Sequence, residues 1–300
     1  MLREQDTPKH YPVLYREILE RLDIKESDIV FDGTVGLGGH GLHIIKQLGQ
    51  KGVYIGTDVD PINLIEAKER LGGRGKATLH LFESSYKEID SILSKAGVTN
   101  INKALLDLGF NAKQLESGKG FSFQKDEPLL MTYGHPDKHI FTAKDIVNTW
   151  SEENIADILY HYADERRSRK IASAIVESRR EAQIETTKDL VNIISKVCRR
   201  SGNIHEATRT FQALRIATND EIGTLRKGLP LIWEKLEKEG MFAVISFHSI
   251  EDRFVKQFFA EKNKLKEATL LTKKPIVPSQ DELKENKRSR SAKLRIAIKK

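Results

Sequence analysis

The sequence predicts an α/β fold in which a helical insertion interrupts a doubly wound, mostly parallel sheet. Short apolar runs alternate with amphipathic stretches over the first third of the chain, the middle third lacks a strand pattern, and a buried strand returns near Met241. Alternation of this kind is typical of a parallel sheet with helices on both faces. Ligands in such sheets bind at the carboxyl ends of the strands, near the point where the strand order reverses.

The first third supplies the opening strands and the helices between them. Each expected strand is a short apolar run, and each expected helix has an apolar and a polar face. In chain order these elements are the strand 28–32, the helix 40–49, the strand 52–58, the helix 61–70, the strand 77–82, the helix 86–96 and the strand 103–108.

The pattern changes after Gly109. Residues 111–140 are rich in turn formers, and the apolar spacing of residues 142–200 is helical, with helix starts at Ser151 and Thr187. The predicted domains are therefore an α/β domain of residues 1–110 and 206–300, and a helical insertion of residues 111–205 that recognises the substrate.

The α/β pattern resumes towards the C-terminus. A helix near 206–219 leads to a second helix that Gly240 is expected to break, and an apolar run at 241–245 is a buried strand. Ser249 then opens a helix in the manner of a capping box. Alternation of apolar and polar residues at 294–298 indicates a closing strand.

Composition excludes several classes of protein. No stretch approaches the ~20 apolar residues of a membrane span, so a soluble protein is expected, and the use of a single cysteine fits a reducing cytoplasm. Cys198 is the single cysteine, which excludes an intramolecular disulfide and a zinc site built from cysteines. The net charge of +7 fits a polyanionic partner and an ordinary solvated surface equally well.

A glycine-rich loop follows the first strand, in Phe31-Asp32-Gly33-Thr34-Val35-Gly36-Leu37-Gly38-Gly39-His40, and Asp58 ends the second strand. Glycines let the backbone turn tightly against a ligand, and a carboxylate at the next strand end suits a ribose diol. The glycine spacing departs from the dinucleotide pattern Gly-x-Gly-x-x-Gly. Asp32 lies before the glycines, where it suits the cationic amino-acid end of S-adenosylmethionine better than a pyrophosphate. We therefore favour the sulfonium cofactor over NAD, and either over a plain structural turn.

Asp107 ends the fourth strand, where an acceptor would meet the methyl group. Methyl transfer needs alignment, exclusion of water and an acceptor for one proton. Asp107 can accept an N–H of an exocyclic amino group, which restores nucleophilicity to the nitrogen. It can equally bind the adenine or methionine end of the cofactor, and both interpretations stay open.

A polar stripe marks the helix near 206–219. Thr208, Gln212, Arg215 and Asn219 share one face of an otherwise apolar helix, which favours a binding-site face slightly over a solvated one. His248 ends a strand but is expected to be structural, and no metal is expected. Six basic residues either follow an RNA backbone or form a solvated surface: Arg166, Arg167, Arg169, Lys170, Arg179 and Arg180.

Several blocks of the chain are long and unusual. They are residues 10–14, the glycine loop, 107–109, 120–123, 288–295, Thr208-Arg209-Thr210-Phe211-Gln212-Ala213-Leu214-Arg215-Ile216 and Ile245-Ser246-Phe247-His248-Ser249-Ile250-Glu251-Asp252-Arg253. Together, and in the same order along the chain as in the family, from about residue 10 to the end, they resemble the bacterial 16S rRNA (cytosine-N4)-methyltransferase family.

The resemblance implies a class I Rossmann-like methyltransferase, S-adenosylmethionine as donor, and N4 methylation of a cytidine in the decoding region of 16S rRNA, within the small ribosomal subunit. It implies cofactor contacts at Gly38, Gly39, His40, Asp58, Asp107 and Gln114, with Tyr86 in place of the usual phenylalanine. With the residue-based reasoning, the candidate cofactor residues are Asp32, Gly36, Gly38, Gly39, His40, Asp58, Tyr86, Asp107 and Gln114, and the candidate catalytic residues are Asp107, Asn111 and Arg215.

Two segments depart from the family pattern. Phe110-Asn111-Ala112 stands where the family has a hydrophobic residue and two serines, and residues 126–134 lack acids and an arginine of the family motif. The departures leave substrate positioning open, and with it the alternative of a non-catalytic RNA-binding protein. An NAD-dependent oxidoreductase is disfavoured by Asp32 and the glycine spacing. The sequence does not determine the oligomeric state, and a homodimer is the assembly considered.

Overall fold

The structure is a computed structural model that describes residues 12–198 and 205–300. His10 and Tyr11, from the first block of the resemblance, lie outside these residues. The chain forms two compact units, an α/β unit of Met1–Gly109 with Thr224–Lys300 and a helical unit of Phe110–Gly223. Each unit has its own hydrophobic core.

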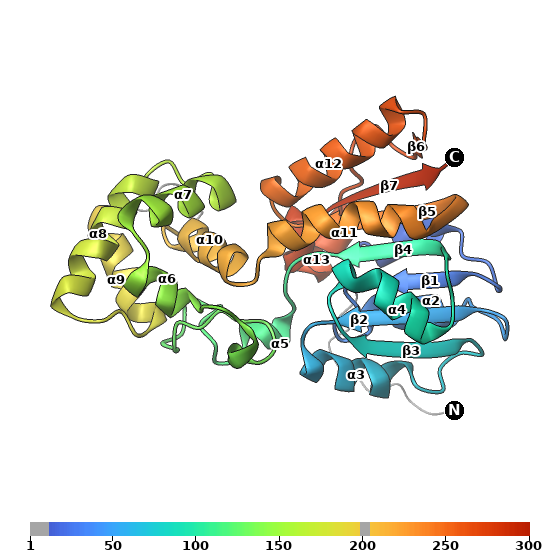
Figure 1. Ribbon diagram of the computed structural model, residues 1–300, viewed down its shortest axis with the longest axis horizontal. Coiled ribbons are helices and arrows are strands. Elements are labelled where there is room, and N and C mark those ends of the chain that lie inside the picture. The colour runs from blue at the N-terminus through green and yellow to red at the C-terminus, as the bar shows by residue number, and fades with distance from the viewer. Residues whose placement is uncertain (1–11, 199–204) are drawn as a thin grey trace. The chain divides into compact units, whose positions relative to one another are not determined.

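A seven-stranded sheet in the order β3-β2-β1-β4-β5-β7-β6 forms the α/β unit (Figure 1). The strands β1 to β5 run parallel, and β7 pairs antiparallel with β5 and β6. This confirms the expected α/β class with a doubly wound, mostly parallel sheet. The strands are β1 (Ile29–Asp32), β2 (Val53–Asp58), β3 (Thr78–Glu83), β4 (Ile101–Asp107), β5 (Leu236–Ser246), β6 (Ala268–Leu270) and β7 (Lys293–Lys299).

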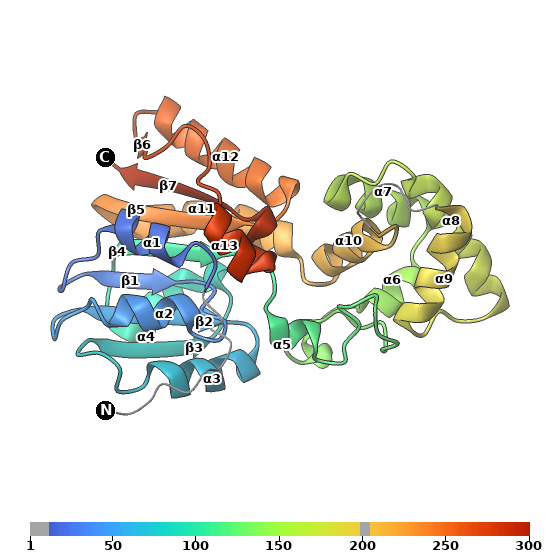
Figure 2. The ribbon, with the colours of Figure 1, turned by 180° about the vertical axis from the view of Figure 1, so that it is seen from behind.

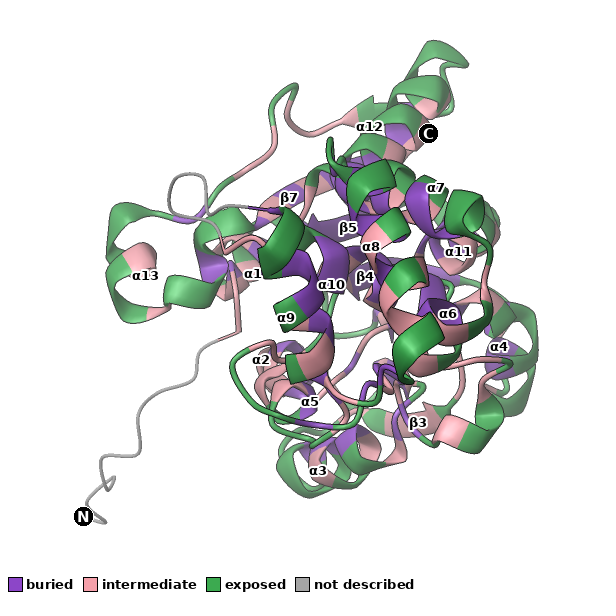
Figure 3. Ribbon diagram, turned by 90° about the vertical axis from the view of Figure 1, so that its left-hand side faces the viewer, coloured by how far each residue is buried: buried purple, intermediate pink, exposed green. Residues whose placement is uncertain are grey.

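Different helices cover the two faces of the sheet. One face carries α1 (Tyr15–Leu22), α2 (Gly39–Ile45) and α3 (Pro61–Leu71) (Figure 2). The other carries α4 (Ile89–Ala96), preceded by the 3₁₀ turn η1 (Tyr86–Glu88), together with α11 (Glu221–Lys235) and α12 (Ser249–Lys264). Successive strand residues point to opposite faces, so Val30 packs with the first set and Phe31 with the second. Burial of each such side chain stabilises the fold by about 1.5–3 kcal/mol. Figure 3 shows that residues of β4 and β5 are buried in this way.

The strand β5 begins earlier than the sequence predicts. Gly240 lies inside β5 and does not end a helix, because the chain is already extended at Leu236, which pairs with Ile101. The next pair joins Lys103 to Met241, so the register shifts across the polar residues between them. Those polar residues look like the end of an amphipathic helix in the sequence. The short strand β6 was also not predicted, and α13 (Gln280–Glu285) and η3 (Lys287–Ser291) complete the unit.

The helical unit contains α5 (Ala112–Leu115), η2 (Pro136–Lys138), α6 (Ala143–Thr149), α7 (Glu152–Ala163), α8 (Ser168–Glu181), α9 (Thr187–Val197) and α10 (Thr208–Thr218). Ser151 caps α7, as predicted, through a bond from the Asn154 amide at 3.2 Å. The cap of α9 is Thr186, one residue before the predicted start, because Thr186 and Asp189 bond each other's backbone in a capping box.

The boundary of the helical unit differs from the predicted one. The helix α10, assigned above to the α/β domain, packs instead with the helical unit through Phe211 and Leu214. Its apolar faces match the core formed by α6 and α7, a fit that is not visible in its own sequence. Among residues 12–198 and 205–300, no helix has both the length and the apolar character needed to span a bilayer.

Candidate active site

The glycine loop connects β1 to α2, and its backbone amides donate hydrogen bonds to β2. The Val35 amide donates to the Thr57 carbonyl at 2.9 Å, and the Gly36 amide donates to Asp58 Oδ2 at 3.0 Å. Gly36 and Gly38 have φ angles of +51° and +76°, in the left-handed region that favours glycine. These bonds fix the shape of the loop at the carboxyl end of β1, where Gly36 is partly exposed.

Asp58 joins the loop to the end of β2. Its Oδ1 accepts from the Asp60 amide at 2.8 Å and its Oδ2 from the Gly36 amide. Burial raises the pKa of Asp58 to about 6, against the opposing effect of these amide donors. Each carboxylate oxygen can accept more than one bond, so the hydroxyls of a ribose could still bind here.

Asp32 lies deeper than the other acids. It is 1% exposed, and it accepts from the Tyr54 hydroxyl at 2.6 Å and from the Thr34 amide at 3.1 Å. Burial raises the pKa of Asp32, although the Tyr54 bond lowers it. Both oxygens therefore hold the loop in place, and direct contact with the cofactor stays a prediction.

Asp107, His40 and Thr34 meet at the end of β4. The Asp107 amide donates to Thr34 Oγ1 at 2.6 Å, and Asp107 Oδ2 lies 3.5 Å from His40 Nε2. Asp107 Oδ1 and His40 Nε2 are buried and have no hydrogen-bond partner among the described residues. Buried polar atoms are rarely left unsatisfied, so this pair is suited to a ligand that brings polar groups of its own.

Tyr86 packs beside the glycine loop. Its side chain is 8% exposed, and a Cβ added at Gly33 would lie 2.7 Å from Tyr86 Cβ. A Cβ at Gly228, on α11, would lie 2.4 Å from the Tyr86 ring. Two glycines thus make room for this aromatic residue, and its cofactor contact stays a prediction.

Asn111 and Gln114 belong to the helical unit and bond each other. Gln114 Oε1 accepts from the Asn111 amide and Asn111 Oδ1 accepts from the Gln114 amide, both at 3.0 Å, in a capping box that starts α5. These bonds give both side chains a structural role. Their assignment to catalysis and cofactor binding stays a prediction.

Arg215 forms a bidentate ion pair inside the helical unit. Its Nε and Nη2 lie 2.8 and 2.9 Å from the two carboxylate oxygens of Glu221, and both side chains are nearly buried. The guanidinium also lies 4.8 Å from the centre of the Phe110 ring, and the Tyr133 hydroxyl donates to Glu221 at 3.0 Å. The paired Arg215 holds α10 against the start of α11.

Two further members of the predicted stripe also bond within the unit. Gln212 donates to the Tyr162 carbonyl at 3.0 Å. Asn219 donates to the Met131 carbonyl at 2.7 Å and accepts from the Tyr133 amide at 2.8 Å, which fixes the segment that departs from the family motif. At these two positions the polar side chains of the helix face therefore form hydrogen bonds within the helical unit.

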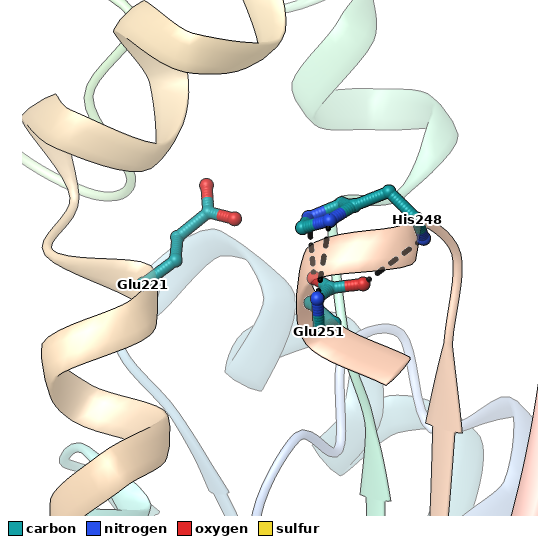
Figure 4. A group of neighbouring side chains, drawn as sticks. All are labelled: Glu221, His248 and Glu251. Carbon is teal, nitrogen blue, oxygen red and sulfur yellow. Dashed lines mark hydrogen bonds and ion pairs between the residues drawn. The ribbon is translucent and has the colours of Figure 1, made fainter. Parts of the chain in front are cut away.

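His248 has a structural role, as the sequence predicts, and this role is the cap of α12. His248 itself caps α12, with Nδ1 accepting from the Glu251 amide at 3.3 Å, where Ser249 was expected to be the cap. Glu251 accepts from the Phe247 amide at 2.9 Å, and its Oε1 lies 3.1 Å from His248 Nε2 (Figure 4). An imidazole nitrogen can accept a hydrogen bond from a backbone amide as a capping hydroxyl does, so Ser249 is not needed as the cap.

Sequence reasoning missed three side chains that position the site. Thr34 lies within the glycine loop, and its hydroxyl, placed among the glycines, is the signal that marks it in the sequence. Tyr54 reaches Asp32 across two strands, and Glu221 reaches Arg215 across a helix break. The last two pairs have no spacing that marks them in the sequence.

We expect nucleoside binding to weaken as the pH falls below about 6. Hydroxyl donors favour the ionised form of Asp58, so a bound ligand lowers the raised pKa of about 6 and binding releases a proton near that pH. Calorimetry with S-adenosylhomocysteine at pH 5 and pH 7 measures this. Asp58→Asn should remove the pH dependence, and Asp58→Ala should weaken binding by about 1–3 kcal/mol. Equal affinity at both pH values in the unmodified chain would contradict this role.

The chain is similar throughout to known methyltransferases. The model of the MraW methylase family matches residues 7–300. A ribosomal RNA small subunit methyltransferase H from Persephonella marina is 43% identical over 292 residues, covering 96% of this chain and 98% of the relative. One of the same name from a Sulfurihydrogenibium species is 44% identical with the same coverage of both. A solved rRNA methylase from Streptococcus thermophilus covers 99% of both chains, with a TM-score of 0.45 and 11% identity. The chain belongs to the MraW methylase family and is an S-adenosylmethionine-dependent methyltransferase.

Proposed function

We propose that this protein methylates the exocyclic N4 amine of a cytidine in the decoding region of 16S rRNA. The observation that carries the proposal is Asp107, at the carboxyl end of β4, with a buried Oδ1 that has no hydrogen-bond partner among the described residues. The names of the relatives supply the RNA class, small-subunit ribosomal RNA. A cytoplasmic location follows from this substrate.

The cofactor end of the site is assigned to the glycine loop and Asp58. S-adenosylmethionine supplies a methyl group on a positively charged sulfur. Asp58 would accept from the ribose hydroxyls, and the partly exposed backbone at Gly36, where an added Cβ would have no neighbour nearer than 3.8 Å, would allow close approach of the nucleoside. Asp32 adds negative charge beneath the loop, where it favours the cationic end of the cofactor.

We assign to Asp107 the activation of the amine and the removal of its surplus proton. The lone pair of an exocyclic amine is delocalised into the base, which makes the nitrogen a weak nucleophile. A carboxylate that accepts one N–H concentrates the lone pair on nitrogen and takes the surplus proton once the new carbon–nitrogen bond has formed. His40 Nε2, 3.5 Å from Asp107 Oδ2, restrains the orientation of the carboxylate and acts as a positioning residue.

The product of the reaction tests this proposal. The purified protein, given a donor with an isotopically labelled methyl group and small-subunit particles, should produce N4-methylcytidine after the RNA is digested to nucleosides. Naked 16S rRNA serves as the comparison, and we expect the assembled particle to be the better substrate. A label on a ring carbon or a ribose oxygen would contradict the assignment of Asp107. A homodimer stays a prediction, which light scattering of the purified chain tests.

A further inference from the structure

The helical unit carries a hollow that none of the candidate catalytic or cofactor residues lines. It has a volume of about 510 Å³ and is lined by Tyr160, Asp164, Arg166 and Arg209. Tyr160 comes from α7, Asp164 and Arg166 from the turn between α7 and α8, and Arg209 from the first turn of α10. Two segments distant in sequence, residues 160–166 and the start of α10, thus converge on one surface site of a size that suits a nucleotide.

The charge of the lining favours an anion. Arg166 and Arg209 are exposed, and neither forms an ion pair with a carboxylate in the described part of the chain. The Arg209 guanidinium makes one long contact, 3.5 Å from Nη1 to the Asp164 carbonyl oxygen. Such a contact is weak, so the guanidinium can turn towards a phosphate, whose oxygens match its planar donors.

Tyr160 adds an aromatic surface to the same hollow. Its side chain is 55% exposed, although tyrosine usually buries most of its ring. The ring of His161 meets it edge to face, with centroids 5.2 Å apart and planes at 81°. An exposed ring beside two arginines is the combination with which proteins bind single-stranded nucleic acid, since bases stack on aromatic faces while cations hold the backbone.

We propose that this hollow is a nucleotide subsite for single-stranded RNA, in which a base stacks on Tyr160 and the adjoining phosphates pair with Arg166 and Arg209. The subsite rests on the proposed function, because it takes RNA to be the substrate. It binds a nucleotide other than the one that is methylated. It therefore contributes to the affinity for RNA and leaves the chemical step unchanged.

Binding of the full chain to a fluorescently labelled single-stranded RNA oligonucleotide tests the proposal. We expect Tyr160→Ala to weaken binding about tenfold through lost stacking, whereas Tyr160→Phe keeps the ring and stays within about twofold of the unmodified protein. The double variant Arg166→Ala with Arg209→Ala should reduce the slope of log affinity against log salt by about 1.4, the effect of two lost phosphate contacts on a single strand. A control that removes two exposed charges elsewhere, Arg74→Ala with Lys188→Ala, should leave that slope unchanged.

Methylation measured in the same preparations separates the subsite from the proposed function. At saturating RNA, each variant should methylate at the rate of the unmodified protein, with the loss confined to the KM for RNA. If the unmodified protein methylates the rRNA and the Tyr160→Ala and double arginine variants bind RNA as it does, the subsite is wrong and the proposed function stands. An equal change of slope in the control pair would also overturn the subsite, because it would show diffuse attraction by surface charge. If the unmodified protein does not methylate rRNA at all, the proposed function is wrong.

Discussion

Replacement of Asp107 by alanine should reduce the rate of methyl transfer by about 10²–10⁴-fold, the usual contribution of a positioned acid or base. The variant loses the carboxylate that accepts an N–H of the amine, while the Asp107 amide can still donate to Thr34 and hold the end of β4 in place. Single-turnover assays with excess enzyme measure the chemical step directly. Because the side chain is partly exposed at the strand end, we expect the variant to fold.

The affinity for the cofactor separates the two roles that the sequence allows for Asp107. If Asp107 binds the amine that accepts the methyl group, Asp107→Ala should bind S-adenosylhomocysteine with nearly unchanged affinity and should lose most of the rate of methyl transfer. Asp58→Ala is the matched control, since it removes the other strand-end carboxylate and should lose affinity while retaining its rate at saturating donor. A large loss of S-adenosylhomocysteine binding in Asp107→Ala, with a normal rate at saturation, would assign Asp107 to the cofactor instead.

Replacement of Arg215 by alanine should destabilise the protein by about 3 kcal/mol, because it leaves Glu221 nearly buried without its charge partner. The Phe110 ring also loses its cation, and the Tyr133 hydroxyl then faces an unpaired carboxylate. Chemical unfolding of the full chain measures the effect. Arg209→Ala is the matched control on the same helix, since that side chain is exposed, and it should change stability little.

A double-mutant cycle identifies the partner of Arg215. Removing Glu221 as well, in Arg215→Met with Glu221→Leu, should restore much of the lost stability, because no isolated charge remains. Single-turnover rates of the folded Arg215→Ala variant then show whether the residue also reaches the substrate. Unchanged stability together with a large loss of rate would favour the catalytic role that the sequence suggested over the structural role of the pair.

The sequence predicts those parts of the site that depend on local pattern. The glycine loop, Asp58 and Asp107 were all placed at strand ends, because apolar runs locate the strands and parallel strands bring their ends to one edge. The structure confirms that placement and adds the contacts between them. Thr34 shows the limit of this reasoning, since its bond to Asp107 needs a loop that folds back towards β4 as well as a hydroxyl, and the sequence pattern shows only the hydroxyl.

Pairs formed across the fold were beyond prediction. The sequence around Tyr54 indicates only a buried strand. Its hydroxyl donates to Asp32 because β1 and β2 are neighbouring strands whose register brings the two side chains together. Glu221 follows Arg215 by six residues, outside the spacing of neighbours on one helix, and meets it because Asp220 breaks the helix with φ of +47°. The early start of β5 has the same origin, since pairing with β4 extends a segment whose sequence alone favours a helix.

The most direct measurement of the central claim is mass spectrometry of nucleosides from 16S rRNA of cells with and without the gene. We predict that N4-methylcytidine is present in the parent strain, is lost in the deletion strain, and returns when the unmodified gene is supplied but not when the Asp107→Ala gene is supplied. An unchanged level of N4-methylcytidine in the deletion strain would contradict the assignment of this protein to that modification.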